Sequence, residues 1–151
     1  MTIKPIRFTT QILDNPKAQS LIAEYAQECS VKEVGPINPQ RDLYEKLENS
    51  GSLKSFGVFD EDEIVGFANV LVYVLPHYGL TIAATESLFV TKDYRVFGAW
   101  QELKKALKVY SKDAGCVGIL YSAPVGGQLE LLLEASKGFQ RTSAVFFERI
   151  A

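Results

Sequence analysis

The chain has few of the residues that most often mark a catalytic thiol or a cross-linked fold, with two cysteines and one histidine among 151 residues. Cys29 and Cys116 both lie in apolar patterns, which favours two reduced thiols in the core of a cytosolic protein. A nucleophilic cysteine would need a histidine partner, and His77 is the only one in the chain. The sequence therefore gives little support for thiol catalysis, and we expect no metal site.

An excess of charge and a long apolar run are also missing. The formal net charge of −2 gives no general attraction to nucleic acid or to an anionic membrane. No apolar run reaches the roughly 20 residues of a membrane span, and the first residues lack the pattern of a signal peptide. We therefore expect a cytoplasmic protein. The apolar fraction of 47% predicts a globular fold, with one domain over residues 1–151.

The hydrophobic pattern predicts an α+β protein of order β-α-α-β-β-β-α-β-α-β. Short turns among the three middle strands predict an antiparallel meander, and the later strand-helix-strand unit predicts one parallel pair. The sheet should thus be mixed and mostly antiparallel, with helices on both faces because its middle strand is apolar almost throughout. The expected strands are residues 3–8, 53–59, 64–75, 80–90, 116–121 and 144–150, and the expected helices are residues 16–29, 39–49, 99–114 and 128–137.

The junction between the strand 80–90 and the helix 99–114 is the most informative segment. Its turn carries Arg95 and Gly98, and the amphipathic helix starts at once. The first backbone N–H groups of a helix are unpaired and the helix dipole there favours negative charge, so the junction predicts a phosphate-binding cradle. Glu86 lies on the strand just before it, which indicates an enzyme that uses a phosphorylated carrier. The alternative is an ordinary strand-turn-helix with glycine at a bend.

The order of elements resembles that of the GCN5-related N-acetyltransferase (GNAT) superfamily over essentially the whole chain. The pyrophosphate motif of that family is Gln/Arg-x-x-Gly-x-Gly/Ala, and here it reads Arg95-Val96-Phe97-Gly98-Ala99-Trp100. The segment Ser136-Lys-Gly138-Phe139 is similar to the junction between the last helix and the closing strand of the family. The resemblance implies a GNAT-like acyl-CoA N-acyltransferase fold.

The resemblance also implies that acetyl-coenzyme A is the co-substrate. The expected diphosphate donors are the backbone amides of Val96, Phe97, Gly98, Ala99 and Trp100, with Arg95 contributing mainly through its backbone. The expected pantetheine partners are the backbone groups of Leu88, Phe89 and Val90, and the N–H of Leu88 would hold the oxyanion. Trp100 stands where a small residue is usual, so its indole must either turn into the core or lie over the pantetheine.

Glu86 is the candidate general base, acting directly or through a water. Strand alternation places it with Ile82, Ala84 and Leu88 on an apolar face, where burial would raise its pKa. A structural ion pair is the alternative. Many relatives carry a tyrosine that protonates the departing thiolate, and that position is Glu134 here. Tyr121 and Ser136 are the nearest substitutes by sequence.

Three functions remain open from the sequence. The first is an N-acetyltransferase acting on a primary amine of an unidentified small molecule or protein. The second is a non-catalytic acyl-CoA-binding or regulatory domain of the same fold, which the absent tyrosine and Trp100 favour. The third is an interaction protein without a cofactor. The resemblance also raises a homodimer as an expectation, because members of the family are often dimers.

Overall fold

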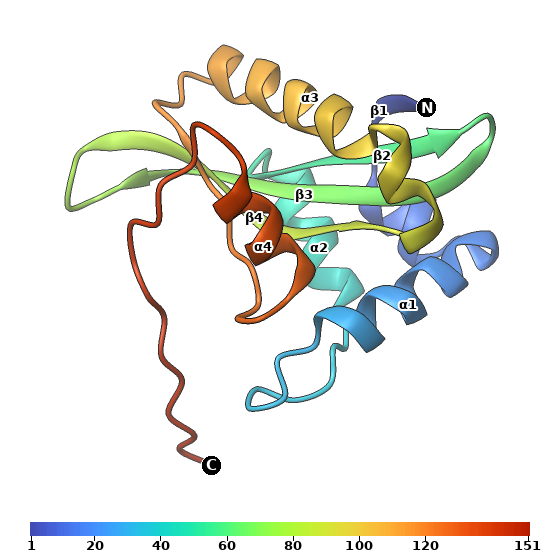
Figure 1. Ribbon diagram of the computed structural model, residues 1–151, viewed down its shortest axis with the longest axis horizontal. Helices are drawn as coiled ribbons and strands as arrows, with labels where there is room; N and C mark the ends of the chain where they lie inside the picture. Colours follow the sequence, from blue (N-terminus) through green and yellow to red (C-terminus); the bar gives the residue numbers. More distant parts are fainter.

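The computed structural model describes all residues, 1–151, and contains a five-stranded sheet of order β1-β2-β3-β4-β5 (Figure 1). The first four strands pair antiparallel, and β5 pairs parallel with β4. This confirms the α+β class with a mixed, mostly antiparallel sheet. The strands are β1 Thr2–Ile6, β2 Leu53–Asp60, β3 Glu63–Leu75, β4 Leu80–Val90 and β5 Ile119–Leu120.

Helices cover both faces of the sheet, as predicted (Figure 1). On one face, α3 buries Leu103 and Leu107 against β2, β3 and β4. On the other face, the segment up to α1 buries Ile12 and Leu21 against Phe67 and Phe89 of the sheet. The helices are α1 Gln19–Cys29, α2 Arg41–Asn49, α3 Ala99–Asp113 and α4 Gln128–Ala135, with short turns of π or 3-10 helix at Thr9–Leu13, Pro16–Ala18 and Lys92–Phe97.

The start of the first helical region follows the local sequence signal. Asn15 has extended backbone, its side chain accepts a hydrogen bond from the N–H of Lys17 at 3.1 Å, and Pro16 follows at the first helical position. An N-cap oxygen satisfies a backbone donor that the helix leaves free, and proline has no such donor to lose. The preceding π-helical turn, Thr9–Leu13, had no signal in the sequence, and it takes Phe8 out of the predicted first strand.

The predicted last strand, residues 144–150, is not part of the sheet. Figure 1 shows the chain leaving α4 and running away from the body, and every residue from 140 to 151 is exposed. β5 has only two paired residues and all of its strand hydrogen bonds go to β4, so the closing strand has no partner within its own chain. No helix in the structure combines the length and the apolar character that crossing a membrane requires.

Candidate active site

Glu86 occupies a β-bulge in the middle of the sheet. On either side of it, Asn69 pairs with Ser87 and Val70 pairs with Thr85, so Glu86 is an extra residue without a partner on β3. A bulge shifts the alternation of the strand by one residue. Leu88 accordingly packs with the cluster on the α3 face, and the expectation that it shares the face of Glu86 is wrong.

The carboxylate of Glu86 is held by donors from three elements. The hydroxyl of Tyr44, on α2, donates to Oε1 at 2.7 Å, and the hydroxyl of Ser87 donates to Oε2 at 2.8 Å. Asn69, on β3, approaches Oε2 at 3.4 Å and donates a shorter bond of 2.8 Å to Ser87. The hydroxyl of Ser55, on β2, donates to the side-chain oxygen Oδ1 of Asn69 at 2.6 Å. This chain of hydrogen bonds fixes the orientation of the carboxylate.

Glu86 itself is exposed, so the expected burial of its side chain is wrong. Its supporting groups are different, because Asn69 is fully buried and Ser87 is 7% exposed. The bulge explains the contrast, since it lets the carboxylate leave the regular packing while its partners stay within the sheet. The carboxylate of Glu86 is therefore oriented by buried side chains of the sheet and is itself exposed to solvent.

Two tyrosines flank the carboxylate on the α1 and α2 side. Burial raises the pKa of Tyr25 to about 12, and the negative charge of Glu86 adds to the rise. Burial also raises the pKa of Tyr44, again with a contribution from Glu86. Both phenols therefore stay protonated at neutral pH, and Tyr44 remains a hydrogen-bond donor to Glu86.

Beyond Glu86, the edge of β4 that faces away from β3 is open. β4 pairs with β5 only at Ala83 and Ala84, so the rest of β4 up to Val90 has no strand on that side. The N–H of Thr91 donates to the carbonyl oxygen of Val65 on β3. The carbonyl oxygen of Val90 faces away from β3 and accepts from Nε of Arg95. Because strand backbone groups alternate in direction, the N–H of Leu88 also faces the open side.

At the end of this edge, Gly98 opens α3 with a φ of +80°. The first backbone bond of the helix runs from the N–H of Glu102 to the oxygen of Gly98. The amides of Ala99, Trp100 and Gln101 thus precede the helical ladder. Gln101 was not foreseen as a donor, although its place in the first helical turn could have indicated it. Val96 and Phe97 lie in the 3-10 turn before Gly98 and are exposed by 82% and 68%.

The guanidinium of Arg95 is occupied by the protein itself. It donates through Nε to the carbonyl oxygen of Val90 at 2.7 Å and through Nη1 to Glu28 of α1 at 3.1 Å. Glu24, one turn earlier on α1, accepts from the hydroxyl of Thr91 at 2.6 Å and from the N–H of Lys92 at 3.2 Å. Hydrogen bonds to the carboxylates of α1 therefore hold the turn that precedes α3 in place, and the Arg95 side chain takes part in these internal contacts.

The indole of Trp100 turns inward. The residue is 9% exposed, its ring centroid lies 5.8 Å from that of Tyr121 and 6.3 Å from that of Phe139, and its Nε1 is buried without a hydrogen-bond partner. Of the two placements expected for this side chain, the structure has the one in the interior. The start of α3 is therefore not covered by the indole.

The other candidate groups are distributed around the molecule. Glu134 pairs with Arg141, and the hydroxyl of Ser136 donates to the carbonyl oxygen of Leu132 at 2.6 Å. Burial raises the pKa of Tyr121 to about 12, and the ring packs on Trp100 beside the open edge of β4. His77 lies exposed at the β3–β4 turn, nine residues along the chain from Glu86.

The two cysteines are free, as expected. Burial raises the pKa of the Cys29 thiol to about 11, with the neighbouring Glu28 adding to the rise. Burial also raises the pKa of Cys116. Neither thiol is activated, because a nucleophilic cysteine needs a lowered pKa. No group of three or more histidine, cysteine, aspartate or glutamate residues is arranged to hold a metal ion.

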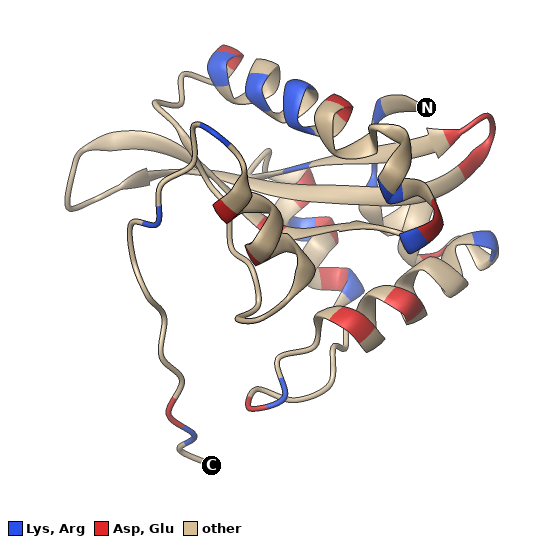
Figure 2. Ribbon diagram, in the orientation of Figure 1, with Lys and Arg blue, Asp and Glu red and all other residues tan.

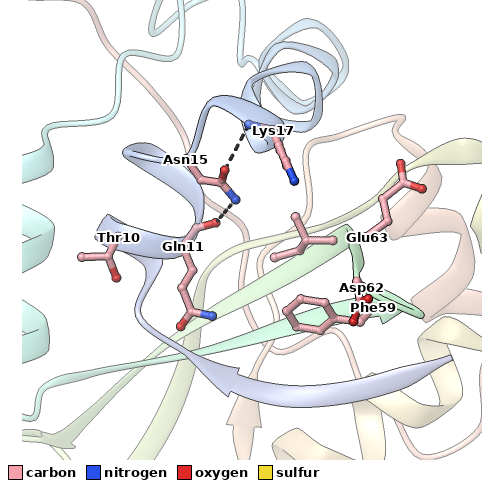
Figure 3. A pocket seen from close by; sticks show the side chains of 8 residues that line it. Thr10, Gln11, Asn15, Lys17, Phe59, Asp62 and Glu63 are labelled. Atoms are coloured by element: carbon pink, nitrogen blue, oxygen red, sulfur yellow. Dashed lines mark hydrogen bonds between the residues drawn. The ribbon is translucent and has the colours of Figure 1, made fainter.

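Charge divides across the sheet (Figure 2), with lysines along α3 and acidic residues along α1 on the opposite side, toward which Glu86 points. A separate groove of about 450 Å³ lies between the first helical turns and the β2–β3 hairpin (Figure 3). Its lining includes Lys17, Asp62 and Glu63 but neither Glu86 nor any residue of the α3 start. The groove is therefore distinct from the arrangement around β4.

The acetyltransferase (GNAT) family matches residues 18–126, a range that includes Glu86, the open edge of β4 and the start of α3. The chain belongs to this family. No curated protein matches it in sequence.

Solved structures of similar fold agree with the family assignment. An aminoglycoside acetyltransferase from an uncultured soil metagenomic sample, in complex with sisomicin, has a TM-score of 0.75 at 16% identity, over 99% of this chain and 95% of that chain. The aminoglycoside N-acetyltransferase AAC(6′)-Iy in complex with CoA has a TM-score of 0.70 at 18% identity, over 99% of both chains. A ribosomal-protein-alanine N-acetyltransferase from Brucella melitensis has a TM-score of 0.65 at 19% identity, over 97% of this chain and 100% of that chain. At such identities the likeness shows the GNAT fold.

Proposed function

We propose that this protein transfers the acetyl group of acetyl-CoA to a primary amine. The observation that carries the proposal is that three features follow one another between Glu86 and the start of α3. An oriented, exposed carboxylate at Glu86 is followed by an open backbone edge at Leu88, and the edge leads to a helix start at Gly98 whose first amides are free of the helical ladder.

The residues present fit the co-substrate. A Cβ placed on Gly98 would meet nothing within 4 Å, and the Trp100 indole is turned away, so a diphosphate has room at the start of α3. The amides of Gly98, Ala99 and Trp100 would hold it, with those of Val96, Phe97 and Gln101 beside them. Arg95 supports the turn through its contacts with Val90 and Glu28. The pantetheine arm would follow the open backbone edge from Leu88 to Val90, where the backbone groups of Leu88 and Val90 face outward and those of Phe89 face β3.

Glu86 is the general base in this proposal. It would take a proton from the acceptor ammonium, directly or through a water, and Tyr44 and Ser87 would keep the carboxylate in place while it does so. The free amine then attacks the thioester carbonyl, with the N–H of Leu88 donating to the developing oxyanion. A nitrogen–carbon bond forms, the carbon–sulfur bond breaks, and the thiolate takes a proton from solvent or from Tyr121.

The test is release of free thiol from acetyl-CoA in the presence of a panel of amines, comparing wild type with Glu86→Gln. We expect acetyl transfer to fall by roughly 10²–10⁴-fold in Glu86→Gln, as for loss of a general base, while acetyl-CoA affinity is kept. Glu134→Gln is the matched control, because Glu134 is exposed and pairs with Arg141. Equal rates for wild type and Glu86→Gln would remove Glu86 from the proposed reaction.

A second candidate is a non-catalytic acyl-CoA-binding protein. It is favoured by the pairing of Glu134 with Arg141 and of Ser136 with Leu132, because these contacts leave no proton donor at the position where many relatives carry tyrosine. Tight binding of acetyl-CoA by calorimetry without thiol release for any amine would establish this candidate. No binding at all would favour the third reading, an interaction protein without a cofactor.

The acceptor is proposed only as an amine. An exposed carboxylate on the side of the sheet where α1 carries its acidic residues suits a cationic group. The structures of similar fold include enzymes named for aminoglycosides and for a ribosomal protein. The amine panel should therefore contain aminoglycosides and peptides with a free N-terminus.

A further inference from the structure

Trp100 is the single tryptophan of the chain, and its indole nitrogen has no hydrogen-bond partner. The residue is 9% exposed and Nε1 itself is buried, so bulk water does not reach the N–H. The rings that pack on the indole belong to Tyr121 and Phe139, and an aromatic face is only a weak acceptor. A buried tryptophan N–H usually has a partner, so an unpaired one points to a group that the chain itself does not supply.

The indole lies alongside the open edge of β4. At one end of this edge, the N–H of Ser122 donates to Thr85 Oγ1 at 3.1 Å, which holds the residues after β5 beside β4. At the other end, Val90 leads through a short turn into α3, whose second residue is Trp100. The contact between Trp100 and Tyr121 connects these two ends, with ring centroids 5.8 Å apart. The Trp100–Tyr121 pair therefore spans the stretch of β4 that has no neighbouring strand.

The indole and the edge of β4 share one side of the sheet. Tyr121 packs on the hydrophobic cluster that contains Ala99 and Leu103 of α3, and Leu88 of β4 packs on the same cluster. Between Leu88 and Val90 the edge offers backbone N–H and C=O groups that face outward. The indole adds a side-chain donor beside them, and packing holds this donor in place before a ligand binds. A ligand that runs along the edge and carries a carbonyl oxygen would satisfy it.

We propose that the indole N–H of Trp100 donates a hydrogen bond to an amide carbonyl oxygen of the pantetheine arm of acetyl-CoA. The inference rests on the proposed function, because it concerns the same co-substrate. The arm contains two amides and has to pass from the diphosphate at the start of α3 to the thioester at Glu86, which is the stretch that Trp100 and Tyr121 span. Trp100 then binds the co-substrate through its side chain as well as through its backbone amide.

The indole donor is selective for one part of the ligand. In the free protein the buried N–H has lost its hydrogen bond to water without gaining another, and this cost is removed when a carbonyl oxygen reaches it. Only a ligand that carries the pantetheine arm brings such an oxygen. A ligand that ends at the diphosphate gains nothing from the indole, which turns away from the start of α3 toward Tyr121 and Phe139. Affinity for CoA should thus depend on the indole N–H, and affinity for ADP should not.

The first experiment uses the single tryptophan as a reporter in nuclear magnetic resonance. In the full chain labelled with the heavy nitrogen isotope, Trp100 gives the only indole N–H signal. Saturation with CoA should move the indole proton downfield, because the N–H gains an acceptor, whereas ADP should leave it in place. The backbone amide of Gly98 should move with both ligands, since both carry the diphosphate. An indole signal that does not move with CoA, or that moves equally with ADP, would overturn the proposal.

The second experiment compares affinities by calorimetry. Trp100→Phe keeps an aromatic ring against Tyr121 and removes the N–H, and we expect Kd for CoA to rise by roughly 2–12-fold, as for one neutral hydrogen bond, with Kd for ADP unchanged. Ser111→Ala is the matched control, because Ser111 Oγ is the other buried polar atom without a partner and lies about three helical turns further along α3. It should leave both affinities unchanged. Should Trp100→Phe fold poorly, benzothienylalanine in place of the single tryptophan removes the N–H and keeps the shape of the ring.

The outcomes separate this inference from the proposed function. Equal CoA affinity with and without the indole N–H would remove Trp100 as a donor and leave the proposed function standing. An equal loss of CoA and ADP affinity would also overturn the inference, because the variant would then have changed the start of α3. If the wild-type protein binds no CoA at all, the proposed function fails, and the inference fails with it.

Discussion

Gly98 offers the sharpest test of the proposed diphosphate site, because a second glycine of the chain provides a matched control. Gly98 precedes α3 and Gly115 follows it, both have a φ of +80°, and neither has an atom within 4 Å of an added Cβ. Alanine at either position must adopt a left-handed conformation, which costs about 1–2 kcal/mol. We therefore expect both variants to lose a similar amount of stability, a fall of roughly 2–8 °C in Tm for a chain of this size.

Only Gly98→Ala should lose affinity for acetyl-CoA. Gly98→Ala places a methyl group in the space assigned to the diphosphate and turns the neighbouring amides away from their directions. Loss of one hydrogen bond to a charged group amounts to about 1.5–3 kcal/mol, which raises Kd by roughly 10–150-fold. Gly115→Ala changes the opposite end of the helix, 17 residues later, and should leave Kd unchanged.

Calorimetric titration with acetyl-CoA and thermal unfolding of the two variants give the comparison directly. If Gly98→Ala binds acetyl-CoA as tightly as Gly115→Ala, the start of α3 does not hold the phosphates. If both variants lose affinity in parallel with Tm, the loss reports general stability, and the assignment of the phosphates to Gly98 is refuted as well.

Three further predictions concern the groups around this path. Tyr44→Phe removes a donor to Glu86 and should lower kcat/KM by about tenfold, or 1.4 kcal/mol, with a changed pH profile and unchanged acetyl-CoA affinity. Arg95→Ala breaks the contact with Glu28 and should lower the free energy of unfolding by about 1–2 kcal/mol, seen in denaturant titration, with little effect on Kd. The pKa of Cys29, raised from 9.0 to about 11 in the folded state, predicts a contribution to stability that is complete below pH 9 and lost as pH rises toward 11. Cys29→Ala should make the slope between pH 9 and 10 shallower, below the range in which the tyrosines with raised pKa values lose their own contributions.

The first two of these have a control in the same chain. Tyr110→Phe removes the hydroxyl of a tyrosine whose ring packs on Phe56, 24 residues from Glu86 in the chain, and should leave kcat/KM unchanged. Lys105→Ala breaks an exposed pair with Glu102 and should cost about 0–1 kcal/mol, so an equal loss for Arg95→Ala would contradict its role as a fastening contact. A slope between pH 9 and 10 that is as steep in Cys29→Ala as in wild type would assign the effect to other groups.

Much of the fold could be predicted because it follows from local chemistry. The periodicity of apolar residues located the three long strands and α3, and the Asn15-Pro16 pair located the start of the first helical region. Gly98 and the free amides at the start of α3 could also be predicted from local sequence. A helix that follows a strand and a turn leaves the same unpaired donors in any fold. The family motif at Arg95 and Gly98 lies in such a segment.

The surroundings of Glu86 could not be predicted in the same way. The bulge is visible only in the pairing of β3 with β4, and it moved Leu88 to the other face and left Glu86 exposed. Tyr44 is 42 residues away along the chain and reaches the carboxylate only because α2 covers that face of the sheet.

The sequence alone thus determined the elements and the helix start that offers its amides, because these depend on residues within a few positions of one another. The tertiary structure decided three things that depend on distant neighbours: the donors that hold Glu86, the inward turn of Trp100 and the unpaired state of residues 144–150. A strand forms only where another strand can receive its hydrogen bonds, and no pattern within residues 144–150 states where that partner is.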